Sequence, residues 1–349
     1  MRYYNLIISD PNSGKVWQPT AAGDGFTQGS TGSTFSSLGS NGQTIPGALN
    51  VEFDIPVYPY HAFQGNSMIT VWGVGLGMLS QAANLNGANI TLAGGMQPGL
   101  PLATAAAQDK QTGILIQGTV FQAYGNWQGV NQTLHLVCNP GAANQNDQNI
   151  NWNWPAGTPL ASAINQALQG AFGSSYKIDT SAISPNLILA NSEQGQYTSL
   201  ANFSSMIADM SLKIGTPIFG PNSNYQGVSI TIRGGTIVAY DDTKPAAVKA
   251  IKFQDMIGQP TWIDAATVNF KVMMRADIAV GSRISFPTGV YPPYVLTSEA
   301  AAVPNAPSRS KSAFQGTFTV REIHHFANFR QSDADSWATA ISAVTSFTA

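Results

Sequence analysis

The sequence predicts a mainly β protein with a small α/β part. Apolar and polar residues alternate along Val51–Val57 near the start and along Val268–Val272 near the end, which is the period of half-buried strands. Between these runs, residues 158–215 place apolar side chains three and four positions apart, as amphipathic helices do. We therefore expect three parts: a first β-barrel domain over 1–140, a linker and small α/β domain over 141–227, and a second β-barrel domain over 228–349.

The first part is expected to open with a strand over residues 2–9. Residues 23–47 are rich in Gly, Ser and Thr and show no apolar period, which predicts a long loop or a flexible arm. A short helix is expected over 76–85. Further strands are expected over 51–57, 68–73, 88–93, 113–123 and 133–138.

The middle part begins with an Asn- and Gln-rich linker. Thr158 and Pro159 suit the N-cap and first position of a helix that Gly173 would end. Ser199 suits the N-cap of a second helix that Gly215 would end. A short β segment is expected between them, over Asn186–Ala190.

The last part returns to alternating patterns. Strands are expected over 228–232, 268–272 and 314–320. The closing run, in which Trp337, Ile341 and Val344 are apolar, fits either a last strand or a short helix.

The chain is poor in charge. Charged residues are 10% of the total and the net charge is −2, whereas soluble domains average about 25% charged residues. A surface of Asn, Gln, Ser, Thr and Gly is tolerable in a subunit whose faces are covered by partners, and it also occurs in secreted proteins. Lys and Arg are scattered, which argues against nucleic-acid binding as a main function.

Other features of the sequence indicate the compartment in which the protein is made. The single cysteine, Cys138, excludes an internal disulfide and a multi-cysteine zinc site. The N-terminal run is too short and lacks the cleavage site of a signal peptide, and no stretch reaches the length of a membrane span. We therefore expect synthesis and assembly in a cytosol, without a membrane partner.

No motif predicts a cofactor or a metal. Gly73, Gly75 and Gly77 follow a strand, but their spacing departs from the dinucleotide-binding pattern, so tight turning and close packing explain them. His324 and His325 are adjacent on an expected strand, where neighbouring side chains point to opposite faces and do not share one metal.

Two alternatives to an assembly role follow from other residues. The carboxylate pairs Asp241–Asp242, Glu52–Asp54 and Asp333–Asp335 are what a cell-wall hydrolase would need, although their settings favour solvated structural roles. The Asn-Trp clusters at Asn126–Trp127 and Asn151–Trp154 would suit a carbohydrate-binding receptor module, or else packing. No residue is assigned a catalytic, cofactor or metal role.

Several long runs resemble one family. Residues 94–103 (GGMQPGLPLA) and 113–141, the opening run 2–19, residues 255–286 and residues 314–341 resemble the baseplate hub proteins of contractile-tailed bacteriophages. Their motifs are packing motifs rather than a catalytic signature. The resemblance covers both ends and the middle of the chain.

The resemblance implies a structural protein rather than an enzyme. Hubs of this family are homotrimers in which each chain supplies two tube-like barrels, so that six barrels match a sixfold tail tube on one side and a threefold central spike on the other. It implies a virion tail baseplate location, assembly in the host cytoplasm with the tube protein, the spike protein and other baseplate proteins, and a channel through which DNA passes in transit. Type VI secretion devices share the plan. The candidate interface residues, chosen because their sequence settings predict exposure rather than from the resemblance, are Met96, Pro98, Trp127 and Trp337.

Overall fold

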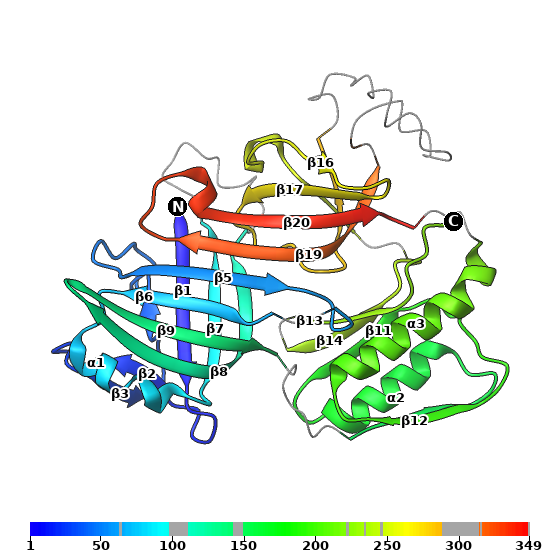
Figure 1. The fold of residues 1–349 in the computed structure, drawn as a ribbon, viewed down its shortest axis with the longest axis horizontal. Helices are drawn as coiled ribbons and strands as arrows, with labels where there is room; N and C mark the ends of the chain where they lie inside the picture. The colour runs from blue at the N-terminus through cyan, green and yellow to red at the C-terminus, as the bar shows by residue number, and fades with distance from the viewer. Residues whose placement is uncertain are drawn as a thin grey trace.

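One mainly antiparallel sheet runs through both ends of the chain in this computed structural model (Figure 1). The structure describes residues 1–62, 65–97, 111–141, 149–220, 223–233, 235–244, 247–287, 314 and 316–347. In this part of the chain the sheet has 15 strands, in the order β16-β17-β20-β19-β5-β6-β9-β8-β7-β1-β2-β3, with β4, β15 and β18 paired off this path. The mainly β prediction is confirmed.

The first module is the part of this sheet formed by the N-terminal residues. Its strands alternate between buried and exposed side chains, and the buried ones form a core that includes Leu6, Ile69 and Leu136. A short helix, α1 (Leu76–Ser80), and a 3₁₀ turn, η1 (Ala82–Leu85), pack beside it. The strands are β1 (Arg2–Ser9), β2 (Val16–Pro19), β3 (Phe26–Gly29), β4 (Phe35–Ser36), β5 (Asn50–Val57), β6 (Ser67–Trp72), β7 (Asn89–Met96), β8 (Gly113–Gln128) and β9 (Asn131–Pro140).

The second module is formed by the C-terminal residues around a core of its own that includes Phe270, Phe318 and Ile341. The closing run is a strand, not a helix. The elements are β15 (Val248–Ala250), η3 (Phe253–Asp255), β16 (Thr261–Trp262), β17 (Thr267–Met273), β18 (Arg283–Ser285), β19 (Thr317–Asn328), η4 (Ala334–Ser336) and β20 (Trp337–Thr345).

The two modules repeat one strand order. The first reads β5-β6-β9-β8-β7 and the second β16-β17-β20-β19-β18, with hairpins at the same places. Each also has a register shift at the same point of its long hairpin, after Val120 in β8 and after Val320 in β19. The likeness ends beyond β7 and β18, because β1 pairs with β7 antiparallel whereas β15 pairs with β18 parallel.

Strands β5 and β19 join the modules. They pair antiparallel from Ile323 opposite Val57 to Asn328 opposite Glu52. Figure 1 shows β17, β20, β19, β5, β6 and β9 as successive ribbons of one surface. The two expected barrels are therefore continuous through backbone hydrogen bonds rather than separated by a linker.

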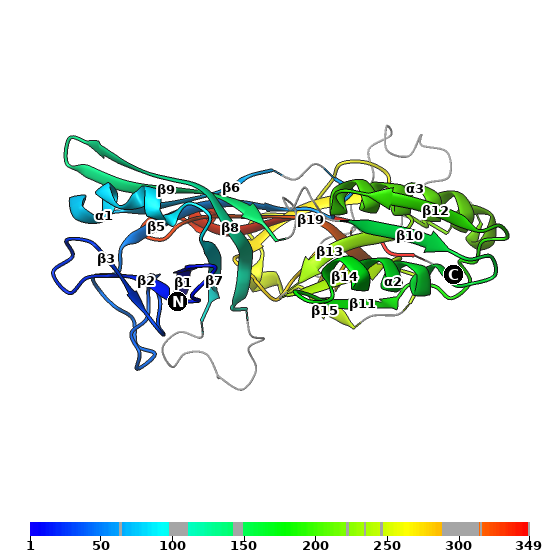
Figure 2. The same ribbon diagram turned by 90° about the horizontal axis from the view of Figure 1, so that it is seen from below.

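The α/β part lies between the modules in sequence and at one end of the molecule in space (Figures 1 and 2). Its helices pack on a two-stranded and a three-stranded sheet around Trp154, Leu168 and Phe203. Strands β13 and β14, which the sequence placed in the third segment, form a three-stranded sheet with β11 of the middle segment, in which β14 pairs with both β11 and β13. The elements are β10 (Ile150–Trp154), α2 (Leu160–Phe172), β11 (Lys177–Ala182), β12 (Glu193–Tyr197), α3 (Leu200–Phe219), β13 (Ser229–Arg233) and β14 (Thr236–Tyr240).

The helix ends differ in part from the prediction. Ser199 caps α3 by accepting from the backbone N–H of Asn202 at 3.2 Å, and Gly173 ends α2, as expected. The other two expectations are wrong. The N-cap of α2 is Pro159 rather than Thr158, and α3 continues through Gly215, where the missing side chain leaves room for the ring of Tyr225.

Two further expectations about loops are wrong. Residues 23–47 are not a free arm, because they contain β3 and β4, and the side chains of Phe26 and Phe35 are buried in the first core. The β segment expected over Asn186–Ala190 is an isolated bridge at Ile188, and the strands of this region are β11 and β12.

Trp337 contributes strongly to the first core. Its side chain is 2% exposed, its ring meets those of Phe53 and Phe329 edge to face, and its Nε1 donates to the carbonyl of Gly95 at 3.1 Å. We expect Trp337→Ala to lower the free energy of unfolding by about 3–5 kcal/mol, because a large buried ring leaves a cavity. Chemical denaturation measures this. Trp127→Ala, at a ring 64% exposed, is the matched control and should change stability by less than about 0.5 kcal/mol.

Candidate assembly surface

The β8–β9 hairpin carries a group of exposed apolar side chains. Trp127 is 64% exposed and its Nε1 donates to the carbonyl of Gly129 at 2.8 Å, which holds the ring against the turn. Val130 at the turn is 97% exposed. Phe121 lies exposed on the same strand. Exposed aromatic residues of this kind are typical anchors of protein interfaces.

One edge of β8, a strand of this hairpin, is open beyond its pairing with β7 in the part of the chain that the structure describes. Strand β7 pairs with β8 only as far as Thr119, and the backbone N–H of Ala123 donates to Asn86 Oδ1 at 2.7 Å on that same side. Since alternate residues of a strand direct their backbone groups to the same side, Gly125 and Trp127 also point theirs away from β9. No strand of the described residues pairs with them there. An unpaired edge of this kind is a template for another strand.

The polar face of the sheet carries hydrogen-bonded pairs between neighbouring strands. Asn328 on β19 donates to Glu52 on β5, and His324 on β19 pairs with Asp54 on β5. Because these pairs join β5 to β19, they reinforce the junction between the modules.

On the first module the same face carries a histidine between two threonines. The ring of His135 lies 4.9 Å from that of Tyr124 and stacks on it, while its nitrogens lie within 3.1 Å of Thr70 Oγ1 and 3.0 Å of Thr133 Oγ1. Burial lowers the pKa of His135. The side chain is fully engaged in packing and hydrogen bonds, which is a structural role.

The four predicted interface residues have different positions. Trp127 is exposed at the hairpin, as expected, and Met96 is half-buried against the first core at the end of β7. Pro98 lies outside the described residues. The exposure expected of Trp337 is wrong, because the ring fills the first core and is covered by Phe53 and Phe329.

The adjacent histidines point to opposite faces of β19, as expected. His324 lies on the polar face with Asp54. His325 is 3% exposed and its Nδ1 lies 2.9 Å from Thr339 Oγ1. Burial, with a smaller contribution from His324, lowers the pKa of His325 to about 3. The pair therefore does not form a metal site.

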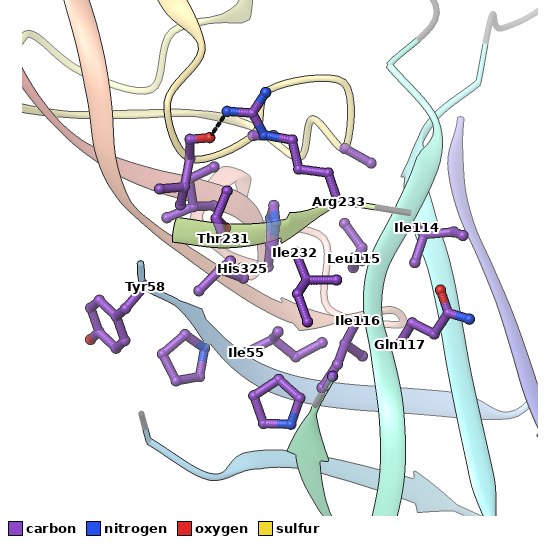
Figure 3. A pocket seen from close by; sticks show the side chains of 18 of the residues that line it. Ile55, Tyr58, Ile114, Leu115, Ile116, Gln117, Thr231, Ile232, Arg233 and His325 are labelled. Atoms are coloured by element: carbon purple, nitrogen blue, oxygen red, sulfur yellow. Dashed lines mark hydrogen bonds between the residues drawn. The ribbon is translucent and has the colours of Figure 1, made fainter. Parts of the chain in front are cut away.

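His325 also borders a cavity between the parts of the molecule. Figure 3 shows this cavity of about 330 Å³ between β5, β8, β13 and β19. Its walls are mainly apolar, with Ile55, Ile116 and Ile232 among them, and Arg233 reaches the carbonyl of Val280 at its border. It has the character of a packing gap where the two modules and the α/β part meet.

In the carboxylate pair Asp241–Asp242, Asp241 is buried and Asp242 is half-buried, so the expected solvation is wrong. Asp241 accepts from the backbone N–H of Ser184 at 2.8 Å and from Thr243 Oγ1 at 2.6 Å, and burial raises its pKa. Asp242 accepts from Arg283 Nε at 2.8 Å. The two side chains tie β14 to its surroundings instead of facing a substrate cleft.

The other two carboxylate pairs also have structural partners. Glu52 and Asp54 pair with β19 as described above. Asp333 caps η4 by accepting from the N–H of Ser336 at 2.7 Å, and Asp335 pairs with Lys271 at 3.2 Å. These contacts give no geometry for a hydrolase.

The second Trp-Asn cluster is part of the core. Trp152 and Trp154 are 3% and 0% exposed, their rings pack against one another, and the ring of Trp152 also packs on Phe203. Stacking on a sugar needs an open ring face, so the carbohydrate interpretation is wrong for this cluster.

The glycines after β6 serve close packing, as expected. A Cβ at Gly77 would lie 1.5 Å from the carbonyl oxygen of Asp24, and one at Gly75 would lie 2.5 Å from that of Gly23. Helix α1 can therefore approach the 23–24 backbone only without side chains at these positions.

Two kinds of feature are absent from the described residues. They contain no group of three or more His, Cys, Asp or Glu side chains placed to hold a metal ion. Within the same residues, no helix has the length and apolar character needed to cross a membrane.

Comparison with known proteins gives matches among solved structures. No family model matches the sequence, and no curated protein does. An Escherichia coli component of the type VI secretion system, described as similar to the T4 bacteriophage tail proteins gp27 and gp5, is 9% identical with a TM-score of 0.47, over 86% of this chain and 75% of that one.

Two bacterial tail proteins also match. A 43 kDa tail protein of prophage MuSo2 from Shewanella oneidensis is 9% identical with a TM-score of 0.49, over 98% of each chain. A tail protein from Neisseria meningitidis MC58 is 9% identical with a TM-score of 0.46, over 85% of this chain and 96% of that one. These three solved structures are thus tail and type VI secretion proteins. At these identities and scores they carry no argument about its partners.

We expect the stability of the protein to fall with acidity through His325. The folded protein keeps this imidazole neutral to about pH 3, whereas the unfolded chain binds a proton below its ordinary pKa of 6.5. The free energy of unfolding therefore decreases as pH falls from about 6.5 to about 3, by up to about 1.4 kcal/mol per pH unit.

Denaturation of the protein and of His325→Gln across this pH range measures the effect. The variant should show a shallower decline, because it has no proton to gain on unfolding at this position. His324→Gln, on the exposed face, is the control; it removes only the smaller contribution to the lowered pKa of His325, so its decline should stay close to the original. Equal slopes for all three proteins would contradict the assignment.

Proposed function

We propose that this chain is a structural subunit of a tail baseplate, acting as a homotrimeric hub between a sixfold tail tube and a threefold central spike. The observation that carries the proposal is the tandem repeat of one strand order, joined edge to edge within the chain. Within the chain, the edge of β19 in the second module pairs with the edge of β5 in the first. The corresponding edges of other modules can repeat that contact between copies of the chain. Head-to-tail contacts of this kind generate rings when the rotation closes.

The number of modules fits the difference in symmetry between a sixfold tube and a threefold spike. Three chains with two modules each present six modules in one ring, so that a threefold assembly offers a nearly sixfold surface. A sixfold tube can dock on that surface, while the α/β parts, one per chain, keep the threefold symmetry for a spike. Low surface charge is consistent with subunits that are covered on several sides.

The proposed ring places the polar face of the sheet toward a channel. Figure 2 shows β5, β6, β9 and β19 along one side of the molecule, with β1, β2 and β3 on the other side. In a ring whose channel faces the polar side of β5 and β19, Glu52, Asp54 and Glu322 would line the channel. Such carboxylates repel phosphates, so DNA in transit would pass without being held.

The proposed location is the virion tail, assembled in the host cytoplasm with tube, spike and other baseplate proteins. A type VI secretion device uses the same plan and is the alternative setting. The chemistry of the chain is the same in both, because the proposed role depends on strand edges and packed surfaces rather than on a catalytic residue.

The mass and shape of the purified chain test the proposal. Light scattering should give three times 36.8 kDa, and negative-stain class averages should show a ring with six lobes around a hole. A monomer of 36.8 kDa that forms no ring would contradict it.

Trp127→Ala should weaken assembly without unfolding the chain. The ring is exposed at the hairpin, so its loss leaves the monomer core intact but removes an aromatic anchor from the proposed interface. We expect the apparent dissociation constant of the trimer to rise roughly tenfold or more, measured by light scattering over a dilution series. Leu212→Ala, at a side chain 40% exposed on α3, is the control and should leave the mass unchanged. Normal trimers from the Trp127 variant would remove this residue from the interface.

A further inference from the structure

We infer that the cavity between the two modules and the α/β part binds a small aliphatic carboxylate, whose acid group pairs with the guanidinium of Arg233 and whose hydrocarbon chain lies against the apolar wall. The shape of the cavity is that of a gap between packed elements, but its one unpaired charge is not explained by packing. An apolar hollow with one cationic side chain in its wall is the complement of such a molecule. The inference concerns the inside of one chain and is separate from the proposed hub role.

The side chain of Arg233 is held in place by neutral groups. Its Nη2 donates to the carbonyl of Val280, and its guanidinium lies 5.5 Å from the centre of the Tyr240 ring. Gly281 leaves room for both, because a Cβ at this glycine would lie 2.5 Å from Arg233 Nη2 and 2.5 Å from the Tyr240 ring. The guanidinium is therefore positioned before a ligand arrives, which lowers the cost of binding one.

No carboxylate of the described residues forms an ion pair with Arg233. Burial lowers the pKa of Arg233, and Asp179 gives a smaller, opposite contribution. The Asp179 carboxylate accepts instead from the N–H of Ser181 at 2.9 Å and from its Oγ at 2.6 Å. By contrast, Arg275 and Arg283, which are also shielded from solvent, each pair with aspartates. A half-buried cation without an anion costs free energy, and a bound carboxylate would offset this cost.

The rest of the cavity suits a hydrocarbon chain. Figure 3 shows Ile55 and Ile116 on the side of the hollow away from Arg233. Ile114 also lines the cavity and is 48% exposed, so an apolar side chain borders the hollow where it reaches the surface. The volume of about 330 Å³ is at the small end of the range for ligand pockets. It equals about eleven water volumes of about 30 Å³, which is room for an acid of about ten heavy atoms, such as octanoate.

His325 adds a second polar group to the wall. Its Nδ1 lies 2.9 Å from Thr339 Oγ1, whereas no described residue forms a hydrogen bond with its Nε2. Because burial lowers the pKa of His325 to about 3, the ring is neutral near pH 7. Arg233 is then the one positive charge among the described residues of the wall, and the His325 ring can report a ligand beside it.

Isothermal titration calorimetry with octanoate on the full chain tests the site. We expect saturable binding of one octanoate per chain. Octanol, which has the same hydrocarbon chain without the charge, should bind about tenfold more weakly or less. Octanoate should also raise the unfolding temperature, because it binds the folded state, and it should shift the ring signals of His325 among the four histidines.

Three variants separate the charge from the shape of the cavity. Arg233→Met removes the charge and should weaken octanoate binding about tenfold or more while leaving octanol binding nearly unchanged. Arg233→Lys keeps a cation and should recover most of the preference for octanoate. Arg321→Met is the matched control, because this half-buried arginine bonds to Ser229 Oγ at 3.1 Å and does not line the cavity, so octanoate should bind as in the original chain.

A fourth variant tests the location. Ala279 lines the cavity, and Ala279→Phe would fill it, so this variant should bind neither octanoate nor octanol. Thermal unfolding of each variant shows that it is folded before it is titrated. Equal affinities for octanoate and octanol in the original chain, an unchanged octanoate affinity in Arg233→Met, or an absence of saturable binding would each overturn the inference. None of these results would affect the hub proposal, which the mass of the assembly tests.

Discussion

The backbone pairing of β5 with β19 is the interaction on which the rest of the structure depends. Six residue pairs, from Val57 opposite Ile323 to Glu52 opposite Asn328, join segments from the two ends of the chain. The contact uses backbone groups, so it needs no particular sequence, and the polar pairs between the two strands reinforce it. It turns two modules with separate cores into one continuous sheet.

The same junction explains why the chain can be poor in charge. A module taken alone has two strand edges, such as those of β5 and β8 in the first module. Each edge exposes a line of backbone hydrogen-bonding groups, which natural proteins protect or cover. Inside the chain one such pair of edges is covered by the partner module. A head-to-tail ring would cover the others in the same way, and few charged side chains would be needed to prevent uncontrolled association.

Much of the fold could be predicted from local pattern, because alternation and helical spacing report which side chains are buried. Strand β5 and the N-cap Ser199 follow from their immediate neighbours. The burial of Trp337 could not be predicted, because it depends on Phe53 and Phe329, which only the fold brings together. The extension of α3 past Gly215 likewise depends on the distant ring of Tyr225.

The candidate surface was predicted only at Trp127, whose place beside glycines indicates a hairpin tip. Two β modules were expected, but their strand-by-strand correspondence could not be predicted, because they share almost no residues beyond Thr119–Val120 and Thr319–Val320 and pairing registers are not visible in a sequence. A cryo-EM map of the assembled chain is the most direct test of this equivalence. The account predicts six modules related by successive rotations of about 60°, with the sheet continuous within and between chains. Modules related by any other rotation, or a sheet interrupted between chains, would contradict it.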